Sequence, residues 1–175
     1  MKKQLAAVML SVCMMLMLLP TTAFAVENYD LYLYLGSEYV GTRITSENAE
    51  DVLGNGTVSY DPSTCTLTLN NARLAGIYTY GHESKVLTIE VIGECIIDSP
   101  RLNAINLYPS TSAGPSYNQD SLVITGNGTL KINALTGSAV GISAFNDVTI
   151  KGTNVEINSS NHAAIALQTQ CDPDL

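Results

Sequence analysis

The chain has 175 residues, of which 16 are acidic and 8 are basic, so its formal net charge is −8 at pH 7. Such a field repels nucleic acid and anionic lipid, and no basic run opposes it locally, so both classes of partner are excluded. This length fits one domain that can bury a hydrophobic core.

Residues 1–25 have the three parts of a cleavable secretion signal. Lys2 and Lys3 precede the apolar run of residues 5–19, and the small-residue site Ala23-Phe24-Ala25 follows. The apolar run is shorter than the roughly 20 residues that span a bilayer. We therefore expect a secreted or cell-surface protein that keeps no membrane span. Cleavage after Ala25 removes two lysines and leaves 6 basic and 16 acidic residues, a formal charge of −10.

Residues 26–66 are predicted to form an N-terminal β cap. Tyrosine and leucine alternate over residues 29–35, which predicts a strand with its leucines inward and its tyrosines outward. Residues 46–53 predict a short helical turn that Ser46 caps. Residues 57–60 and 65–70 predict a β-hairpin, in which Pro62 suits the second position of a type I turn.

Residues 67–175 contain an internal repeat, which predicts the main body of the fold. Three short apolar strands recur about 25 residues apart, with an inserted polar loop at residues 108–120. One turn of a parallel β-helix has these properties, so we expect an all-β fold of about four stacked coils. The strands at residues 122–124, 130–133 and 140–142 recur at 148–150, 155–158 and 165–167, and an earlier copy occupies 87–89, 96–98 and 105–107.

Asp98, Asn133 and Asn158 occupy the same place in successive copies of the repeat. We expect them at a corner of the coil that needs a residue tolerant of left-handed backbone geometry. Stacked asparagine side chains can also hydrogen-bond to one another along such a corner. The favoured interpretation is a structural ladder, and a ligand site is the alternative.

The segment from residue 29 to residue 72 carries a family resemblance. Its motifs are Tyr29-Asp30-Leu31, residues 45–49, residues 51–54, and residues 56–62 with 66–72. They resemble the opening module of large secreted surface proteins of Clostridia-type Gram-positive bacteria. Beyond residue 72 the chain is similar in pattern to pectate-lyase-like right-handed β-helices, which include carbohydrate-binding domains. The resemblance implies a right-handed β-helix and a chain that is a fragment of a longer surface protein.

Catalytic and metal-binding patterns are weak in this sequence. No Asp-Asp or Asp-x-Asp pair lies on a repeated strand, as polysaccharide hydrolysis or calcium-assisted cleavage would need. His82 and His162 have no serine and aspartate partners around them, and Asp98, Arg101 and Asp120 are expected to be solvated surface charges. We expect no enzyme, no metal and no cofactor. A calcium ion has no supporting motif, and a polysaccharide lyase or hydrolase is the minority alternative.

Three cysteines follow the signal, namely Cys65, Cys95 and Cys171. Three thiols cannot all pair within one chain. A Cys65–Cys95 disulfide is one alternative in an oxidising compartment, and buried free cysteines are the favoured interpretation.

Tyrosines are the candidate ligand contacts. Tyr78 and Tyr80 alternate with Ile77 and Thr79, so both point to one face of a strand, and Tyr108 and Tyr117 flank the inserted loop. Aromatic rings of this kind stack on sugars, so we expect a non-catalytic domain that binds polysaccharide or host glycan. Ordinary packing of the loops and the cap is the alternative interpretation of these tyrosines.

The alternative function is a structural or spacer module of a larger surface protein. The last predicted coil ends near Leu167 and eight residues follow it, which leaves that end of the coil uncovered. An uncovered coil exposes core side chains and unpaired strand edges, so we expect self-association there.

Overall fold

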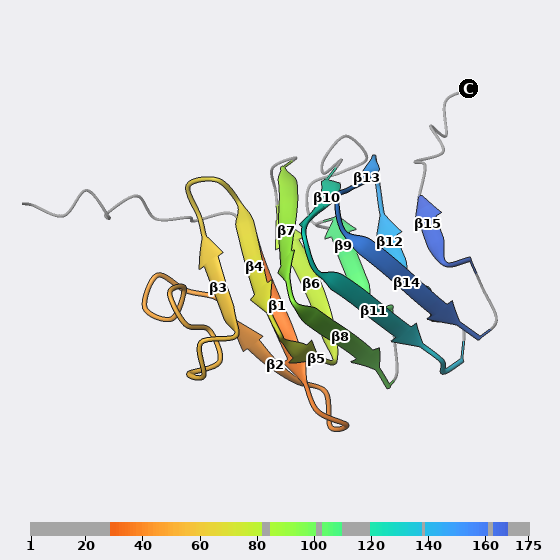
Figure 1. Ribbon diagram of the computed structural model, residues 1–175, viewed down its shortest axis with the longest axis horizontal. Coiled ribbons are helices and arrows are strands. Elements are labelled where there is room, and N and C mark those ends of the chain that lie inside the picture. Colours follow the sequence, from red (N-terminus) through yellow and green to blue (C-terminus); the bar gives the residue numbers. More distant parts are fainter. Residues whose placement is uncertain are drawn as a thin grey trace, which may run out of the picture.

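The computed structural model describes residues 29–81, 85–100, 103–109, 120–137, 139–160 and 163–167. In these ranges the protein is all-β, with its strands arranged in three mostly parallel sheets and no helix (Figure 1). The same ranges accordingly contain no helix long and apolar enough to cross a membrane. The predicted signal, residues 1–25, lies outside the described residues.

The strands fall into three sheets, which we name A, B and C. Sheet A has the order β15 (Ile165–Leu167), β12 (Ile142–Ala144), β9 (Ile105–Pro109), β6 (Gly76–Gly81), β1 (Tyr29–Leu35) and β2 (Val40–Arg43). Sheet B has the order β13 (Val148–Lys151), β10 (Ser121–Gly126), β7 (Val86–Ile92), β4 (Thr66–Asn70) and β3 (Val58–Asp61). Sheet C has the order β14 (Asn154–Ser159), β11 (Thr129–Ala134), β8 (Glu94–Ser99) and β5 (Arg73–Leu74).

From β4 onward the chain passes through sheets B, C and A in the same order four times (Figure 1). We call each passage a round: β4–β6, β7–β9, β10–β12 and β13–β15. Equivalent strands of successive rounds pair in parallel, and Leu122 lies opposite Leu87 on one side and Val148 on the other. This register confirms the alignment of the sequence repeats.

The strands before β4 pair in the antiparallel sense. β1 pairs with both β2 and β6, and β3 pairs with β4. The predicted hairpin is confirmed, because Asp61 lies opposite Thr66 at its closed end. There Oδ1 of Asp61 accepts a hydrogen bond of 2.9 Å from the backbone N–H of Ser63, which fixes the turn. Leu31 and Leu33 of β1 are buried, as their alternation with tyrosine predicts.

The helical turn predicted at residues 46–53 is wrong. This segment makes successive tight turns, and its backbone also pairs with β3: the carbonyl of Ala49 accepts from the N–H of Tyr60 at 2.7 Å, and the N–H of Val52 donates to the carbonyl of Val58 at 2.9 Å. A helix would need these same backbone groups for its own hydrogen bonds. Pairing with the neighbouring strand therefore replaces the helix.

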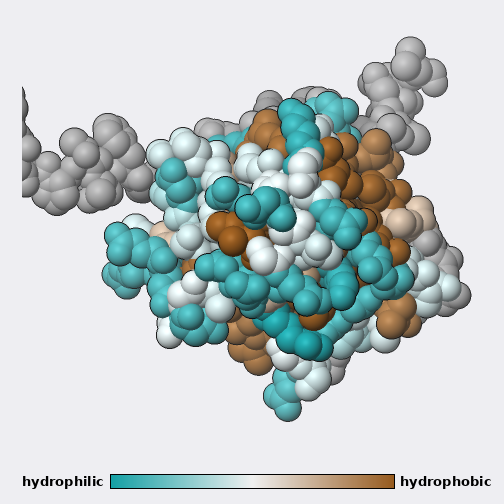
Figure 2. All heavy atoms as spheres, in the orientation of Figure 1, coloured by the Kyte–Doolittle hydropathy of each residue, from teal (hydrophilic) through white to brown (hydrophobic). Residues whose placement is uncertain are grey.

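The hydrophobic core lies between the three sheets and is filled by the inward residues of each strand. Equivalent isoleucines show where the core ends: Ile89 and Ile124, in the second and third rounds, are 0% exposed, whereas Ile150 in the fourth is 41% exposed. Figure 2 shows hydrophobic residues gathered at the side of the molecule where the fourth round lies. The first three rounds thus enclose the core, and the fourth leaves part of its inward surface open.

Candidate functional site

Five tyrosines meet on the outer face of β1 and β6, together with the turn that follows β1. We call Tyr32, Tyr34, Tyr39, Tyr78 and Tyr80 the tyrosine cluster. Side chains alternate between the faces of a strand, so the burial of Ile77 and Thr79 in the core directs Tyr78 and Tyr80 outward. The antiparallel register then places Tyr32 directly opposite Tyr78.

The rings of the cluster hold one another in fixed orientations. Tyr34 stacks on Tyr39 with the ring centroids 4.2 Å apart and meets Tyr78 edge-on at 5.0 Å. Tyr32 meets Tyr80 edge-on at 5.5 Å. Each such pair contributes about 0.5–1.5 kcal/mol beyond the burial of its surface. Mutual packing therefore orients the rings before any ligand arrives.

Tyr78 and Tyr80, the two candidate ligand contacts on β6, differ in their exposure to solvent. Tyr78 is 4% exposed, and its hydroxyl donates a hydrogen bond of 2.9 Å to the carbonyl of Asn103, so its ring has no face open to a ligand. Tyr80 is 38% exposed. Tyr108 lies beside Tyr80 in the β6–β9 ladder. Tyr117 lies outside the described residues.

Burial raises the pKa of the two cluster tyrosines on β6. It raises the pKa of Tyr80 to about 12, and it raises the pKa of Tyr78 further. A neutral phenol both donates and accepts hydrogen bonds. At the rim of the cluster, Asp30 lies opposite Tyr80 and accepts from Nε of Arg43 at 3.0 Å. The exposed edge of the cluster thus combines an aromatic ring with a charged pair.

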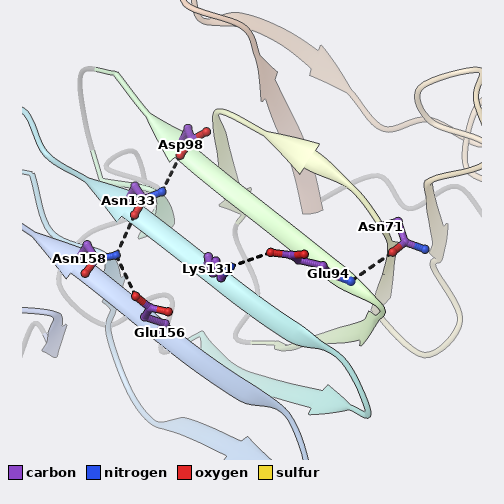
Figure 3. A network of polar contacts seen from close by, with 7 residues as sticks. All are labelled: Asn71, Glu94, Asp98, Lys131, Asn133, Glu156 and Asn158. Atoms are coloured by element: carbon purple, nitrogen blue, oxygen red, sulfur yellow. Dashed lines mark hydrogen bonds and ion pairs between the residues drawn. The ribbon is translucent and has the colours of Figure 1, made fainter.

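The predicted ladder residues lie on neighbouring strands of sheet C (Figure 3). Nδ2 of Asn133 donates to Oδ1 of Asp98 at 2.7 Å, and Nδ2 of Asn158 donates to Oδ1 of Asn133 at 2.9 Å. Nη2 of Arg73 donates to Oδ2 of Asp98 at 2.5 Å and extends the chain of contacts to the first round. We call Arg73, Asp98, Asn133 and Asn158 the polar row.

The expectation that the ladder residues occupy a corner with left-handed geometry is wrong. Asp98, Asn133 and Asn158 lie within β8, β11 and β14, and none has a positive φ. The corner between sheets B and C instead uses Asn71, with φ of 50°, and Gly93, with φ of 69°. A repeat places equivalent residues side by side, but it does not by itself distinguish the end of a strand from its interior.

A cavity of about 360 Å³ adjoins the polar row at the first round. Leu74 and Ala75 provide buried apolar surface, and the paired side chains of Arg73 and Asp98 provide the polar wall. Gly36 and Ser37, in the turn between β1 and β2, also line the cavity. The cavity is lined by Gly36, Ser37, Arg73, Leu74, Ala75, Asp98 and Pro100.

A second polar contact crosses the same sheet beside the polar row (Figure 3). Nζ of Lys131 lies 2.7 Å from Oε1 of Glu94. This ion pair lowers the pKa of the Glu94 carboxyl and raises that of the Lys131 ammonium. Oδ1 of Asn71 accepts from the backbone N–H of Glu94 at 3.2 Å, which joins the pair to the corner between sheets B and C.

The expectation that Asp120 is a solvated surface charge is wrong. Asp120 is 1% exposed. Its Oδ1 accepts from the backbone N–H of Lys85 at 2.8 Å, and its Oδ2 accepts from the hydroxyl of Thr79 at 3.4 Å. Burial raises the pKa of this carboxyl. Asp120, just before β10 in the third round, therefore binds Lys85, just before β7 in the second round. The polar sequence of the loop does not predict this contact between rounds.

The Cys65–Cys95 disulfide is not formed, because both cysteines are free thiols. Cys65 precedes β4, whereas Cys95 follows the corner beyond the end of β7, and β4 and β7 run in parallel. Cys65 therefore lies at one end of sheet B, and Cys95 lies in β8 of sheet C, beyond the opposite end. Cys95 is buried, as the favoured interpretation of the sequence expects, whereas Cys65 is only half-buried. Cys171 lies outside the described residues.

No group of three or more His, Cys, Asp or Glu side chains able to hold a metal ion occurs among the residues that the structure describes. His82, His162 and Arg101 lie outside those residues. Comparisons of the chain with protein-family models, curated proteins and solved structures give no match.

Proposed function

We propose that this chain is a secreted, non-catalytic β-helical domain of a bacterial surface that binds polysaccharide or host glycan. The observation that carries the proposal is the exposed ring of Tyr80 within an otherwise packed tyrosine cluster. Ligand sites combine apolar or aromatic surface with a few fixed polar groups, and Tyr80 with the Asp30–Arg43 pair has this composition.

The chemistry of a sugar ring matches this arrangement. One face of a pyranose presents C–H groups that pack on an aromatic ring, while its hydroxyl groups seek donors and acceptors at the rim. Tyr32 packs against Tyr80, so a bound sugar does not have to order that ring. The neutral tyrosine hydroxyls repel no ligand by charge, which favours recognition by shape and hydrogen bonding.

The finer fold that we propose is a right-handed parallel β-helix, with residues 26–66 as its N-terminal cap. The four rounds through three sheets support this fold. Between two neighbouring parallel strands of one sheet, the chain passes through the other two sheets. Crossover connections between parallel strands of one sheet are almost always right-handed. The resemblance of residues 29–72 to the opening module of secreted surface proteins supports the location.

A structural or spacer module is the second candidate function, and the fourth round favours it. Leu167 is 54% exposed although the equivalent inward residue of the second round, Leu107, is 0% exposed. Such a surface suits stacking of a further repeat or of a second copy. The two functions differ in whether the domain binds sugar.

A glycan array with residues 26–175 separates these candidates. The proposal expects saturable binding to a subset of polysaccharides or host glycans and no release of shorter products during incubation. A well-folded protein that binds none of them leaves the spacer function. Product release that requires the protein would instead establish an enzyme.

A further inference from the structure

The outer face of sheet C carries a second set of groups suited to a sugar polymer. The polar row crosses four neighbouring strands, β5, β8, β11 and β14. Neighbouring strands lie about 4.8 Å apart, so the row extends over about 14 Å. The distance of about 4.8 Å between neighbouring strands is close to the length that one sugar unit adds to an extended polysaccharide chain.

The two asparagines of the row keep different hydrogen-bonding capacity: Nδ2 of Asn158 donates both to Asn133 and to Oε1 of Glu156 at 3.4 Å, so Asn158 offers only its oxygen as an acceptor, whereas Asn133 offers a donor and an acceptor. Asn133 uses one N–H toward Asp98 and one oxygen lone pair toward Asn158. A side-chain amide has two N–H donors and an oxygen with two lone pairs, so one donor and one acceptor remain. The row is accessible, since Asn158 is exposed and Asn133 is half-buried. A vicinal pair of sugar hydroxyls can use that donor and acceptor together.

An apolar strip lies beside the polar row on the same face. Ile96 is half-buried and pairs in register with Lys131, whose side chain reaches back to Glu94 on β8, so its aliphatic stem widens the strip between β8 and β11. The C–H face of a sugar can pack on such groups while its hydroxyls reach the row. At one end the strip leads to the cavity beside Leu74 and Ala75, which offers room for a terminal sugar.

The charges of this face favour a neutral ligand. The described strands of sheet C carry three acidic side chains, Glu94, Asp98 and Glu156, and two basic ones, Arg73 and Lys131. Both basic groups are paired with carboxylates at 2.5 Å and 2.7 Å. A polymer with a carboxylate on every unit would meet net negative charge here, in addition to the negative charge of the whole chain.

We infer that the outer face of sheet C binds a neutral linear polysaccharide, which lies across the strands along the polar row with one end in the cavity at Arg73. The inference rests on the proposed function for the class of ligand, but it uses a face different from the one that Tyr80 occupies. Each round of the fold contributes one strand of sheet C, so the contacts of the polar row recur at a regular spacing. A ligand that uses all of them needs a regular repeat of its own.

The test measures the affinity of residues 26–175 for di- to hexasaccharides of cellulose, chitin and mannan, with oligogalacturonides as the acidic comparison. The expected result is an affinity for a neutral series that increases with length up to about four units and then levels off, because the row crosses four strands. Oligogalacturonides of equal length are expected to bind more weakly.

Variants assign this binding to the polar row. Asn133→Ala and Asn158→Ala are each expected to weaken tetrasaccharide binding about fivefold to tenfold, the effect of one hydrogen bond, and to flatten the dependence on length. Asn127→Ala is the matched control, since Asn127 is exposed at the corner between β10 and β11, away from the row. Thermal unfolding of each variant reports its fold, and Asn158→Ala loses contacts only at the exposed end of the row.

The outcomes separate this inference from the proposed function. Glycan binding that Tyr80→Ala removes, but that both asparagine variants retain with no dependence on length, overturns the inference and leaves the proposed function standing. Stronger binding of oligogalacturonides than of every neutral series also overturns it. A folded protein that binds no glycan in any format overturns both.

Discussion

The ring of Tyr32 packs edge-on against the ring of Tyr80, with 5.5 Å between their centroids. The first belongs to β1, before the repeats, and the second to β6 in the first round, so the antiparallel pairing of these strands creates the aromatic surface. The repeats alone would leave Tyr78 and Tyr80 on an open sheet. The N-terminal strand buries Tyr78 and orients Tyr80.

Tyr78→Phe tests whether Tyr78 is a packing residue. The variant loses the hydrogen bond from the tyrosine hydroxyl to the carbonyl of Asn103 but keeps the buried ring. We expect the free energy of unfolding to fall by about 1 kcal/mol, with glycan binding unchanged. Urea denaturation and a glycan titration measure the two quantities. Loss of binding in a variant of unchanged stability would assign Tyr78 to the ligand instead.

Asp120→Asn tests the buried carboxyl. The pKa of Asp120 is raised in the folded protein. At pH values between the ordinary aspartate pKa of about 3.9 and this raised pKa, the native state therefore binds more protons than the unfolded state. The contribution of Asp120 to stability is therefore fully present below that window and is lost as the pH rises through it. Asparagine does not titrate and can still accept from the N–H of Lys85.

Chemical denaturation across this window checks the prediction. We expect the stability of the wild type relative to Asp120→Asn to fall as the pH rises. Asp147→Asn is the control, because Asp147 lies just before β13 but is exposed. Parallel pH profiles for the wild type and Asp120→Asn would show that burial of this carboxyl has no energetic consequence.

Gly126→Ala tests the close approach of successive rounds at the corner between sheets B and C. A Cβ atom at Gly126 would lie 2.2 Å from the carbonyl oxygen of Val91, and the φ of 120° there is unfavourable for any other residue. We expect a loss of at least about 3 kcal/mol in the free energy of unfolding. Gly137→Ala meets no atom within 4 Å but also has a positive φ, so we expect a loss of about 1 kcal/mol. Equal losses in the two variants would contradict this account of the corner.

The sequence repeats predict the register of the parallel strands correctly because stacking demands that equivalent residues coincide. Leu122 and Val148 have the same inward role, so the apolar pattern alone aligns them. The position of Asp120 could not be predicted in the same way. Its burial depends on Lys85 and Thr79, which the fold brings to it from another round.

The candidate site was predicted only in part, for a similar reason. Alternation on β6 correctly directs Tyr78 and Tyr80 to the outer face, but no local pattern states that β1 pairs beside them. The helix predicted at residues 46–53 fails because Ala49 and Val52 pair with β3, and that pairing is also set outside the segment. Local sequence determines which face a side chain takes, and long-range pairing determines what covers it.

Ile124→Ala and Ile150→Ala test where the core ends. The two isoleucines are neighbours in register on β10 and β13, but only Ile124 is fully buried. We expect Ile124→Ala to lower the free energy of unfolding by about 2–5 kcal/mol and Ile150→Ala to lower it by less than half as much. Equal losses in dilute solution would show that the fourth round is covered there, and analytical ultracentrifugation would then show whether a second copy covers it.

Titration of Tyr80→Ala and Tyr80→Phe with the strongest glycan from the array tests the proposed function most directly. The exposed ring is the stacking surface, so Tyr80→Ala is expected to weaken binding at least about tenfold, whereas Tyr80→Phe keeps the ring and is expected to stay within about threefold of the wild type. Both variants are checked for folding by thermal unfolding. Unchanged affinity of a folded Tyr80→Ala variant would contradict the assignment of glycan binding to the tyrosine cluster.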